Sequence, residues 1–228
     1  LRSVNYSNQN LEKFNNSDVN LKIYKNKKIK IGYYSSDFFD HATMFLISGL
    51  LREHNTEEFE IFVFSYGNVK QSQLVDDTMK KVNLFKNISK MSDLEIVNLS
   101  RKLEIDIAID LKGYTLNSRS KLFAYRLAPI QINYLGYPGT LGSSFIDYLV
   151  ADKTLIPPEF RNCYKEKIVY LPNSYQPNDD KRIISKDTTS RSNFDLPIKG
   201  FVFCCFNTSY KITPEEIEVW SNILNKVN

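Results

Sequence analysis

The sequence predicts an α/β fold in which a mostly parallel sheet is covered by helices on both faces. Short apolar runs alternate with amphipathic helical segments along the 228 residues, the pattern that builds such a sheet. The run at 59–64 is almost entirely apolar, as expected of a strand buried on both faces. A turn signal, Pro138-Gly139, follows another such run. The length suits one large domain, or one domain and part of another.

The elements are expected in the following order. Residues 1–27, rich in Asn and Lys, are interpreted as a linker or the end of a preceding region. A strand at 28–33 opens the domain, because apolar residues alternate there, and a helix with a broad apolar face follows at 42–53. Ser92 and Glu95 form a capping box that starts a helix ending near residue 103. Further strands are expected at 59–64, 106–111, 130–135, 145–150 and 167–171, and a short helix near 120–127.

A second domain is expected near the C-terminus. Residues 173–197 are polar with little periodicity, which predicts an interdomain linker and limits the first domain to 28–172. An apolar run at 201–206 predicts a strand, and Thr213, Pro214 and Glu216 predict a helix start. One strand and one helix cannot bury both of their faces, so we expect 198–228 to be the truncated start of this domain.

Composition excludes several partners. The net charge of +4, from 30 basic and 26 acidic residues, is spread along the chain, so no nucleic-acid partner is expected. The apolar runs are too short to span a membrane. Cys163, Cys204 and Cys205 have neither disulfide nor metal spacing. We expect them to be small buried residues in a reducing compartment, the cytoplasm.

Metal and nucleotide-loop motifs are absent from the sequence. It contains no glycine-rich phosphate loop, no His-Glu-x-x-His and no Asp-x-Asp after a strand. If the chain handles a nucleotide-sugar, cationic side chains and backbone N–H groups must therefore neutralise the leaving diphosphate.

His41 lies between the first strand and the first helix, at the ligand-binding edge of such a sheet. It either acts on a ligand, as a group that titrates near neutral pH or donates to a sugar hydroxyl, or it caps the helix. The Gly136–Thr140 turn either approaches a ligand or is a plain turn. Asp110 is a better site candidate than Asp106, because it is nearer the carboxyl end of its strand.

Lys211 lies two residues before the predicted helix cap at Thr213. Its ammonium either meets an anion held at the helix N-terminus or is an ordinary solvated group.

Five blocks in register resemble the catalytic region of the O-GlcNAc transferase/SPINDLY family, glycosyltransferase family 41. The blocks are 31–38 with His41, 105–115, 128–131 with 134–142, Asp147-Tyr148, and 206–207 with 210–212. The resemblance implies a GT-B architecture of two Rossmann-like domains, of which this chain is the N-terminal one plus the first βα unit of the second. It also implies inverting transfer of N-acetylglucosamine from UDP-GlcNAc to Ser or Thr hydroxyls of proteins, with neither metal nor cofactor.

The resemblance also assigns residues. His41 and Lys211 are the expected catalytic residues, the first on the sugar and acceptor side and the second against the departing UDP. Ten further positions are expected to bind substrate: Gly136, Tyr137, Pro138, Gly139, Thr140, Asp110, Thr115, Asn207, Thr208 and Tyr210.

Departures from the family leave alternatives open. Phe45 replaces a second His of many relatives, and Thr208 replaces their usual Gln or Asn. The tetratricopeptide repeats that normally precede this region are not seen in the sequence. A different donor such as GDP-fucose or another UDP-hexose, or a degenerate binding module, remains possible, and the oligomeric state is open. The chain alone is expected to be inactive and to bind UDP weakly.

Overall fold

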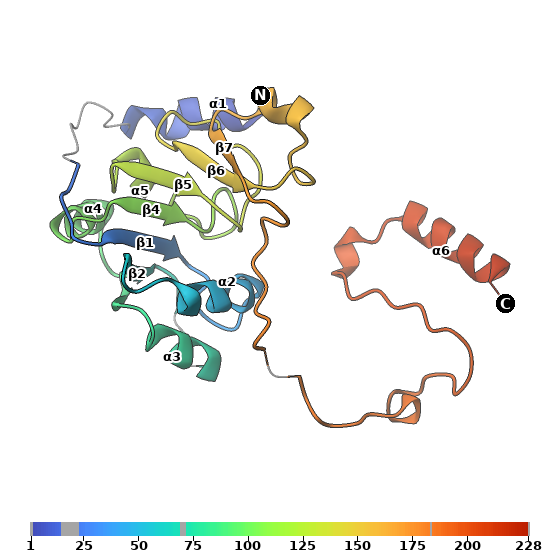
Figure 1. Ribbon diagram of the computed structural model, residues 1–228. Helices are drawn as coiled ribbons and strands as arrows, with labels where there is room; N and C mark the ends of the chain where they lie inside the picture. The colour runs from blue at the N-terminus through green and yellow to red at the C-terminus, as the bar shows by residue number, and fades with distance from the viewer. Residues whose placement is uncertain (1, 15–22, 69–71, 183, 228) are drawn as a thin grey trace. The chain divides into compact units, whose positions relative to one another are not determined.

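The computed structural model describes residues 2–14, 23–68, 72–182 and 184–227 (Figure 1). Contacts between residues divide the chain into two units, Leu1–Arg182 and Ile183–Asn228. Each unit is described by itself.

The first unit contains a seven-stranded sheet in the order β3-β2-β1-β4-β5-β6-β7. Every neighbouring pair is parallel, so the predicted parallel sheet is confirmed. The order runs outward in both directions from the β1–β4 pair, as in a doubly wound sheet. The strands are β1 (Ile29–Ser35), β2 (Phe59–Ser65), β3 (Leu84–Asn87), β4 (Ile107–Asp110), β5 (Ile130–Asn133), β6 (Tyr148–Ala151) and β7 (Lys167–Tyr170).

Helices cover both faces of the sheet, and each face has its own apolar core. Alternate residues of β1 separate the two cores, because successive side chains of a strand point to opposite faces. Tyr34 packs with α4 and α5, whereas Tyr33 packs with α2 and α3. These helices are α2 (Ala42–Glu53), α3 (Gln73–Met79), α4 (Asp93–Lys102) and α5 (Lys121–Ala124).

The predicted cap of α4 is confirmed: Glu95 Oε2 accepts from the backbone N–H of Ser92 at 2.8 Å, and the Ser92 hydroxyl accepts from the backbone N–H of Glu95. The sequence analysis did not predict α3 and β3. Helix α3 is short, and in β3 two apolar residues are followed by Lys86 and Asn87, so the run lacks the alternation that predicts a strand.

The N-terminal segment that was predicted to be a linker packs on the first unit. Helix α1 (Arg2–Asn10) and the 3-10 helix η1 (Glu12–Phe14) precede β1, and Leu11 between them is buried in the core on the α4 side. Residues 1 and 15–22 of the predicted segment 1–27 lie outside the described residues. The first unit also contains the 3-10 helix η2 (Pro158–Cys163).

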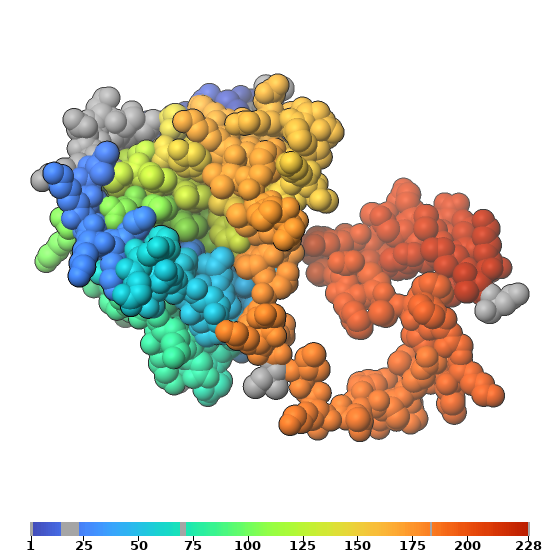
Figure 2. Space-filling view, in the orientation of Figure 1, coloured from blue at the N-terminus to red at the C-terminus, as the bar shows by residue number. Residues whose placement is uncertain are grey.

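After β7 the chain runs beside α2, as the orange segment in Figure 2 shows. Tyr134 donates from its hydroxyl to the carbonyl of Tyr175 at 2.8 Å. Arg52 forms an ion pair of 2.6 Å with Asp179. Residues 173–182 of the predicted linker 173–197 therefore contact the sheet domain, and residue 183 lies outside the described residues.

The second unit contains the 3-10 helices η3 (Arg191–Phe194) and η4 (Ser209–Lys211) and helix α6 (Pro214–Lys226). Its predicted helix start is confirmed by the capping box of Thr213 and Glu216. No strand is assigned over 201–206, which differs from the prediction. A strand needs a neighbour to satisfy its N–H and C=O groups, and no pairing is found for this run among the described residues.

The three cysteines differ from the expectation that they are buried. Cys163, Cys204 and Cys205 are all exposed, with free thiols. Cys204 and Cys205 lie in the run that was expected to be a strand, so without strand pairing their side chains are not covered.

Candidate functional site

The switch point of the sheet lies between β1 and β4, where the strand order reverses direction. Open α/β sheets bind ligands outside the carboxyl ends of their strands at such a point. Because β1, β4 and β5 are parallel neighbours, the loops that follow them lie on one edge: residues 36–41, 111–115 and 134–140. His41 and the Gly136–Thr140 turn therefore share the edge that the sequence predicts for both.

Each of these loops is fastened by the polar side chain that ends its strand. Ser35 Oγ accepts a hydrogen bond from the backbone N–H two residues later at 3.0 Å. Asp110 Oδ1 does the same at 2.8 Å. Asn133 donates from Nδ2 to the carbonyl of Tyr137 at 2.9 Å. The paths of the loops are thus set by buried side chains rather than by solvent-exposed contacts.

A buried ion pair joins the loops after β1 and β4. Lys112 Nζ lies 2.7 Å from Oδ2 and 3.0 Å from Oδ1 of Asp37. The two residues are 5% and 6% exposed, so the pair is shielded from solvent. Two buried charges need this close geometry, because desolvation costs several kcal/mol per ion, as an order-of-magnitude estimate. The sequence analysis singled out neither residue; their signal was that each follows a strand end within a matched block.

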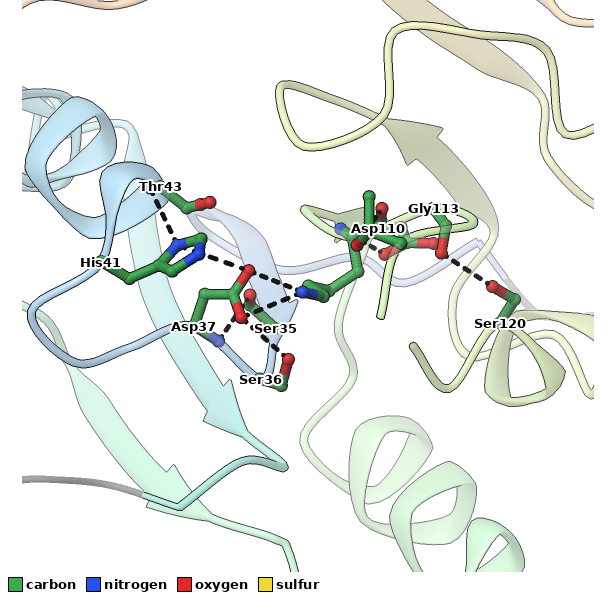
Figure 3. A network of polar contacts seen from close by, with 10 residues as sticks. Ser35, Ser36, Asp37, His41, Thr43, Asp110, Gly113 and Ser120 are labelled. Atoms are coloured by element: carbon green, nitrogen blue, oxygen red, sulfur yellow. Dashed lines mark hydrogen bonds and ion pairs between the residues drawn. The ribbon is translucent and has the colours of Figure 1, made fainter. Parts of the chain in front are cut away.

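His41 caps α2 and also lies at the ligand-facing edge (Figure 3). Its Nδ1 accepts a hydrogen bond from the backbone N–H of Thr43 at 3.2 Å. The same nitrogen is 3.7 Å from Oδ2 of Asp37, beyond hydrogen-bond distance. The side chain is 41% exposed, so the ring is open to a ligand.

The Gly136–Thr140 turn is interlocked with the loop after β4. A Cβ on Gly136 would lie 2.0 Å from the carbonyl oxygen of Leu111, so only glycine fits there. Gly113 has φ +54°, and a Cβ on it would lie 2.5 Å from Cβ of Tyr137. Each loop thus leaves room for the other, and the two form one surface at the switch point.

The hydroxyl of Thr140 forms hydrogen bonds with other groups of the protein. It donates to Glu166 Oε2 at 2.6 Å and accepts from the backbone N–H of Gly142 at 2.9 Å. Glu166 is buried and its Oε1 accepts from the backbone N–H of Leu141 at 2.7 Å. The sequence analysis missed Glu166, a single acid between two lysines with no pattern to mark it.

Asp110 and Thr115 also serve the loop after β4. Burial raises the pKa of the Asp110 carboxyl to about 6, and the hydrogen bonds from the backbone N–H groups of Lys112 and Gly113 oppose the shift. Its Oδ2 is buried without a hydrogen-bond partner among the described residues. The Thr115 hydroxyl donates to the carbonyl of Lys112 at 2.9 Å. Asp110 therefore lies beneath the surface of the edge.

The remaining site candidates lie in the second unit. Lys211 ends η4, and its backbone N–H donates to the carbonyl of Thr208 at 2.9 Å. Asn207 precedes this turn and Tyr210 lies within it, and all four residues are exposed. They form one short segment before α6, as their spacing in the sequence indicates.

Within the described residues, no group of three or more His, Cys, Asp and Glu side chains is placed to hold a metal ion. In the same part of the chain, no helix has the length and apolar character needed to cross a bilayer.

Comparison with known proteins places these observations in a family. The model of glycosyl transferase family 41 matches residues 9–188 and 180–228. A probable UDP-N-acetylglucosamine–peptide N-acetylglucosaminyltransferase SEC of Arabidopsis thaliana is 36% identical over 206 residues, covering 88% of this chain and 21% of that protein. A probable enzyme of the same kind, SPINDLY of Solanum lycopersicum, is 32% identical over 208 residues, covering 88% and 22%. The chain thus spans about a fifth of the length of these relatives.

A solved structure has the same fold. The structure of a mutant O-GlcNAc transferase of Thermobaculum terrenum superposes with a TM-score of 0.82 at 25% sequence identity. The match covers 98% of this chain and 42% of that one.

Proposed function

The chain belongs to glycosyl transferase family 41, and on this premise we propose that it carries part of the site of an inverting, metal-independent glycosyltransferase. The donor is UDP-GlcNAc, and the acceptors are Ser and Thr hydroxyls of proteins, as the names of its relatives suggest. In the reaction the acceptor oxygen bonds to the anomeric carbon while the bond to the diphosphate breaks. The electron pair of the broken bond leaves with UDP, and the proton of the acceptor hydroxyl passes to solvent water.

One observation carries the proposal: the exposed imidazole of His41 and the glycine-dependent turn Gly136–Thr140 lie on the carboxyl edge of the sheet, around its switch point. This is the place and the kind of surface that holds a sugar linked to a phosphate. The ring supplies a hydrogen-bonding group, and the turn lets backbone groups approach closely.

Lys211 is the proposed partner of the leaving diphosphate. Negative charge grows on the diphosphate as the glycosidic bond breaks, so an ammonium placed there stabilises the transition state more than the bound donor. Its exposed position before α6 supports this role, because the side chain is not committed to another group by a hydrogen bond or ion pair of the described chain.

The free, exposed cysteines support a reducing compartment, and we assign the activity to the cytoplasm. Protein acceptors and the nucleotide-sugar are the proposed partners.

The test is release of UDP from UDP-GlcNAc, and sugar transfer to Ser- and Thr-containing peptides, by the full-length protein. We expect product with an inverted anomeric centre, and no change on addition of a chelator. A parallel assay with GDP-fucose decides the donor. Nucleotide binding without turnover of any nucleotide-sugar would contradict the enzyme and favour a binding module.

A further inference from the structure

We propose that Lys112 is a positioning residue for His41, one that holds Asp37 away from the imidazole and so keeps the ring proton on Nε2. No motif pointed to this role, because the two lysine contacts arise only where the loops after β1 and β4 meet.

Both carboxylate oxygens of Asp37 already accept hydrogen bonds, so the carboxylate does not depend on the imidazole as a donor. Oδ1 accepts from Lys112 Nζ and from the hydroxyl of Ser36, both at 3.0 Å. Oδ2 accepts from Lys112 Nζ at 2.7 Å and lies 3.7 Å from Nδ1 of His41. The carboxylate is therefore satisfied by an ammonium, although a histidine ring stands next to it.

The contacts of His41 agree with this. Its Nδ1 accepts the backbone N–H of Thr43 at 3.2 Å, so this nitrogen carries no proton in the neutral ring. The proton is then on Nε2. Because Nδ1 is engaged with the helix end, Nε2–H is the ring group left for a ligand, and it is a donor.

Removal of Lys112 should change which group binds the carboxylate of Asp37. Asp37 would become a buried carboxylate without a counter-ion, which is strongly unfavourable. The nearest group able to satisfy Oδ2 is Nδ1–H of His41, through a charge-assisted bond. That bond is stronger than the neutral cap bond from Thr43 that it replaces, because one of its partners is charged. The proton should move to Nδ1, leaving Nε2 as an acceptor.

The experiment reads the tautomer directly. The chain has two histidines, so ¹⁵N-histidine labelling gives four ring nitrogens, and long-range ¹⁵N–¹H spectra distinguish protonated from bare nitrogens. Spectra are recorded about two pH units above the ordinary histidine pKa of about 6.5. His54, whose Nε2 lies 2.8 Å from the Tyr33 hydroxyl, is the internal reference.

We expect a bare Nδ1 and a protonated Nε2 on His41 in the wild type, and the opposite in Lys112→Met. The double variant Asp37→Asn/Lys112→Met should return to the wild-type pattern, because the competing carboxylate is gone. Lys30→Met is the control. It removes a lysine near the N-terminal end of β1, where its partners are Glu104 and the carbonyl of Leu103. It should leave the tautomer of His41 unchanged.

A protonated Nδ1 in the wild type, or an unchanged tautomer in Lys112→Met, would overturn the proposal. If Lys112→Met does not fold, Lys112→Ala gives the same test with room for water beside Asp37. In this variant a detectable fraction of His41 should carry its proton on Nδ1. The absence of that tautomer would contradict the proposal.

The consequence for sugar transfer rests on the proposed function. In the full-length enzyme, Lys112→Met should lower kcat more than it raises the KM for the donor, because His41 then presents a lone pair where a donor is needed. A flipped tautomer with unchanged transfer would refute the role of His41 in the reaction and leave the assignment of Lys112 standing.

Discussion

Gly136 packs against the carbonyl oxygen of Leu111, so closely that a Cβ would lie 2.0 Å from it. The contact joins the loops after β4 and β5 at the edge where ligands bind in sheets of this kind. The obstacle is backbone, which cannot rotate away as a side chain can. The glycine is thus required by a tertiary contact, since its own backbone does not need a left-handed conformation.

Gly136→Ala should destabilise the first unit by about 1–3 kcal/mol, the usual cost of overpacking. Urea unfolding measures the loss. Gly139→Ala is the matched control in the same turn: the atoms nearest to its Cβ would belong to the side chain of Tyr137, from 2.9 Å, and that side chain can shift. Equal losses for the two variants would contradict the role of the Leu111 carbonyl.

Thr140→Val should cost about 1–3 kcal/mol in the free energy of unfolding, because it leaves a buried oxygen of Glu166 and the backbone N–H of Gly142 without a partner. Thr140→Ser keeps the hydroxyl and should lose much less. The comparison is made by chemical denaturation of the two variants and the wild type. A serine variant as unstable as the valine variant would show that the methyl group matters rather than the hydroxyl.

Asp110 should make stability depend on pH. Burial raises the folded-state pKa of its carboxyl to about 6 from the ordinary value of 3.8, so the folded state binds the proton more tightly than the unfolded state. The stabilisation of the folded state by the protonated Asp110 carboxyl is fully present below pH 3.8 and is lost as the pH rises through about 6. At 1.36 kcal/mol per pKa unit the loss is about 3 kcal/mol.

Asp110→Asn tests this dependence. Unfolding free energies measured from pH 4 to pH 7 should fall less steeply in the variant than in the wild type, and the difference between the two curves should level off above the folded-state pKa. Parallel curves over this range would mean that Asp110 is ionised in the folded protein at every pH tested.

Lys211→Ala should lower turnover of the full-length enzyme by about a hundredfold, or roughly 3 kcal/mol, with a much smaller rise in the KM for the donor. The reason is that diphosphate charge increases toward the transition state. Lys211→Arg should recover only part of the rate, because a planar fork does not replace a compact point charge. Near-normal kcat with weakened donor affinity would make Lys211 a ground-state anchor instead.

Much of the fold follows from local pattern. Apolar runs at 29–34 and 59–64 are long enough to predict strands, and Ser92 with Glu95 is sufficient to predict a helix start. The run at 201–206 is the instructive exception. Its composition is that of a strand, but a strand is defined by a partner, and none is found among the described residues.

The candidate site was predictable only in outline. His41 and Gly136–Thr140 follow strands, so their common edge could be predicted from the chain order and a parallel sheet. Glu166 could not be found in this way, because its partner Thr140 is 26 residues earlier and neither residue carries a local motif for the contact.

By itself the sequence determined the strands of the sheet other than β3, the helices α2, α4, α5 and α6, and which residues stand at the carboxyl edge. These properties depend on neighbours within a few positions, and periodicity and capping report them directly. Only the tertiary structure decided that Lys112 meets Asp37 across 75 residues, and that Asp110 is buried beneath the edge. Such contacts depend on strand order and on how the loops pack. The strand order β2-β1-β4-β5 places them, and no local pattern encodes it.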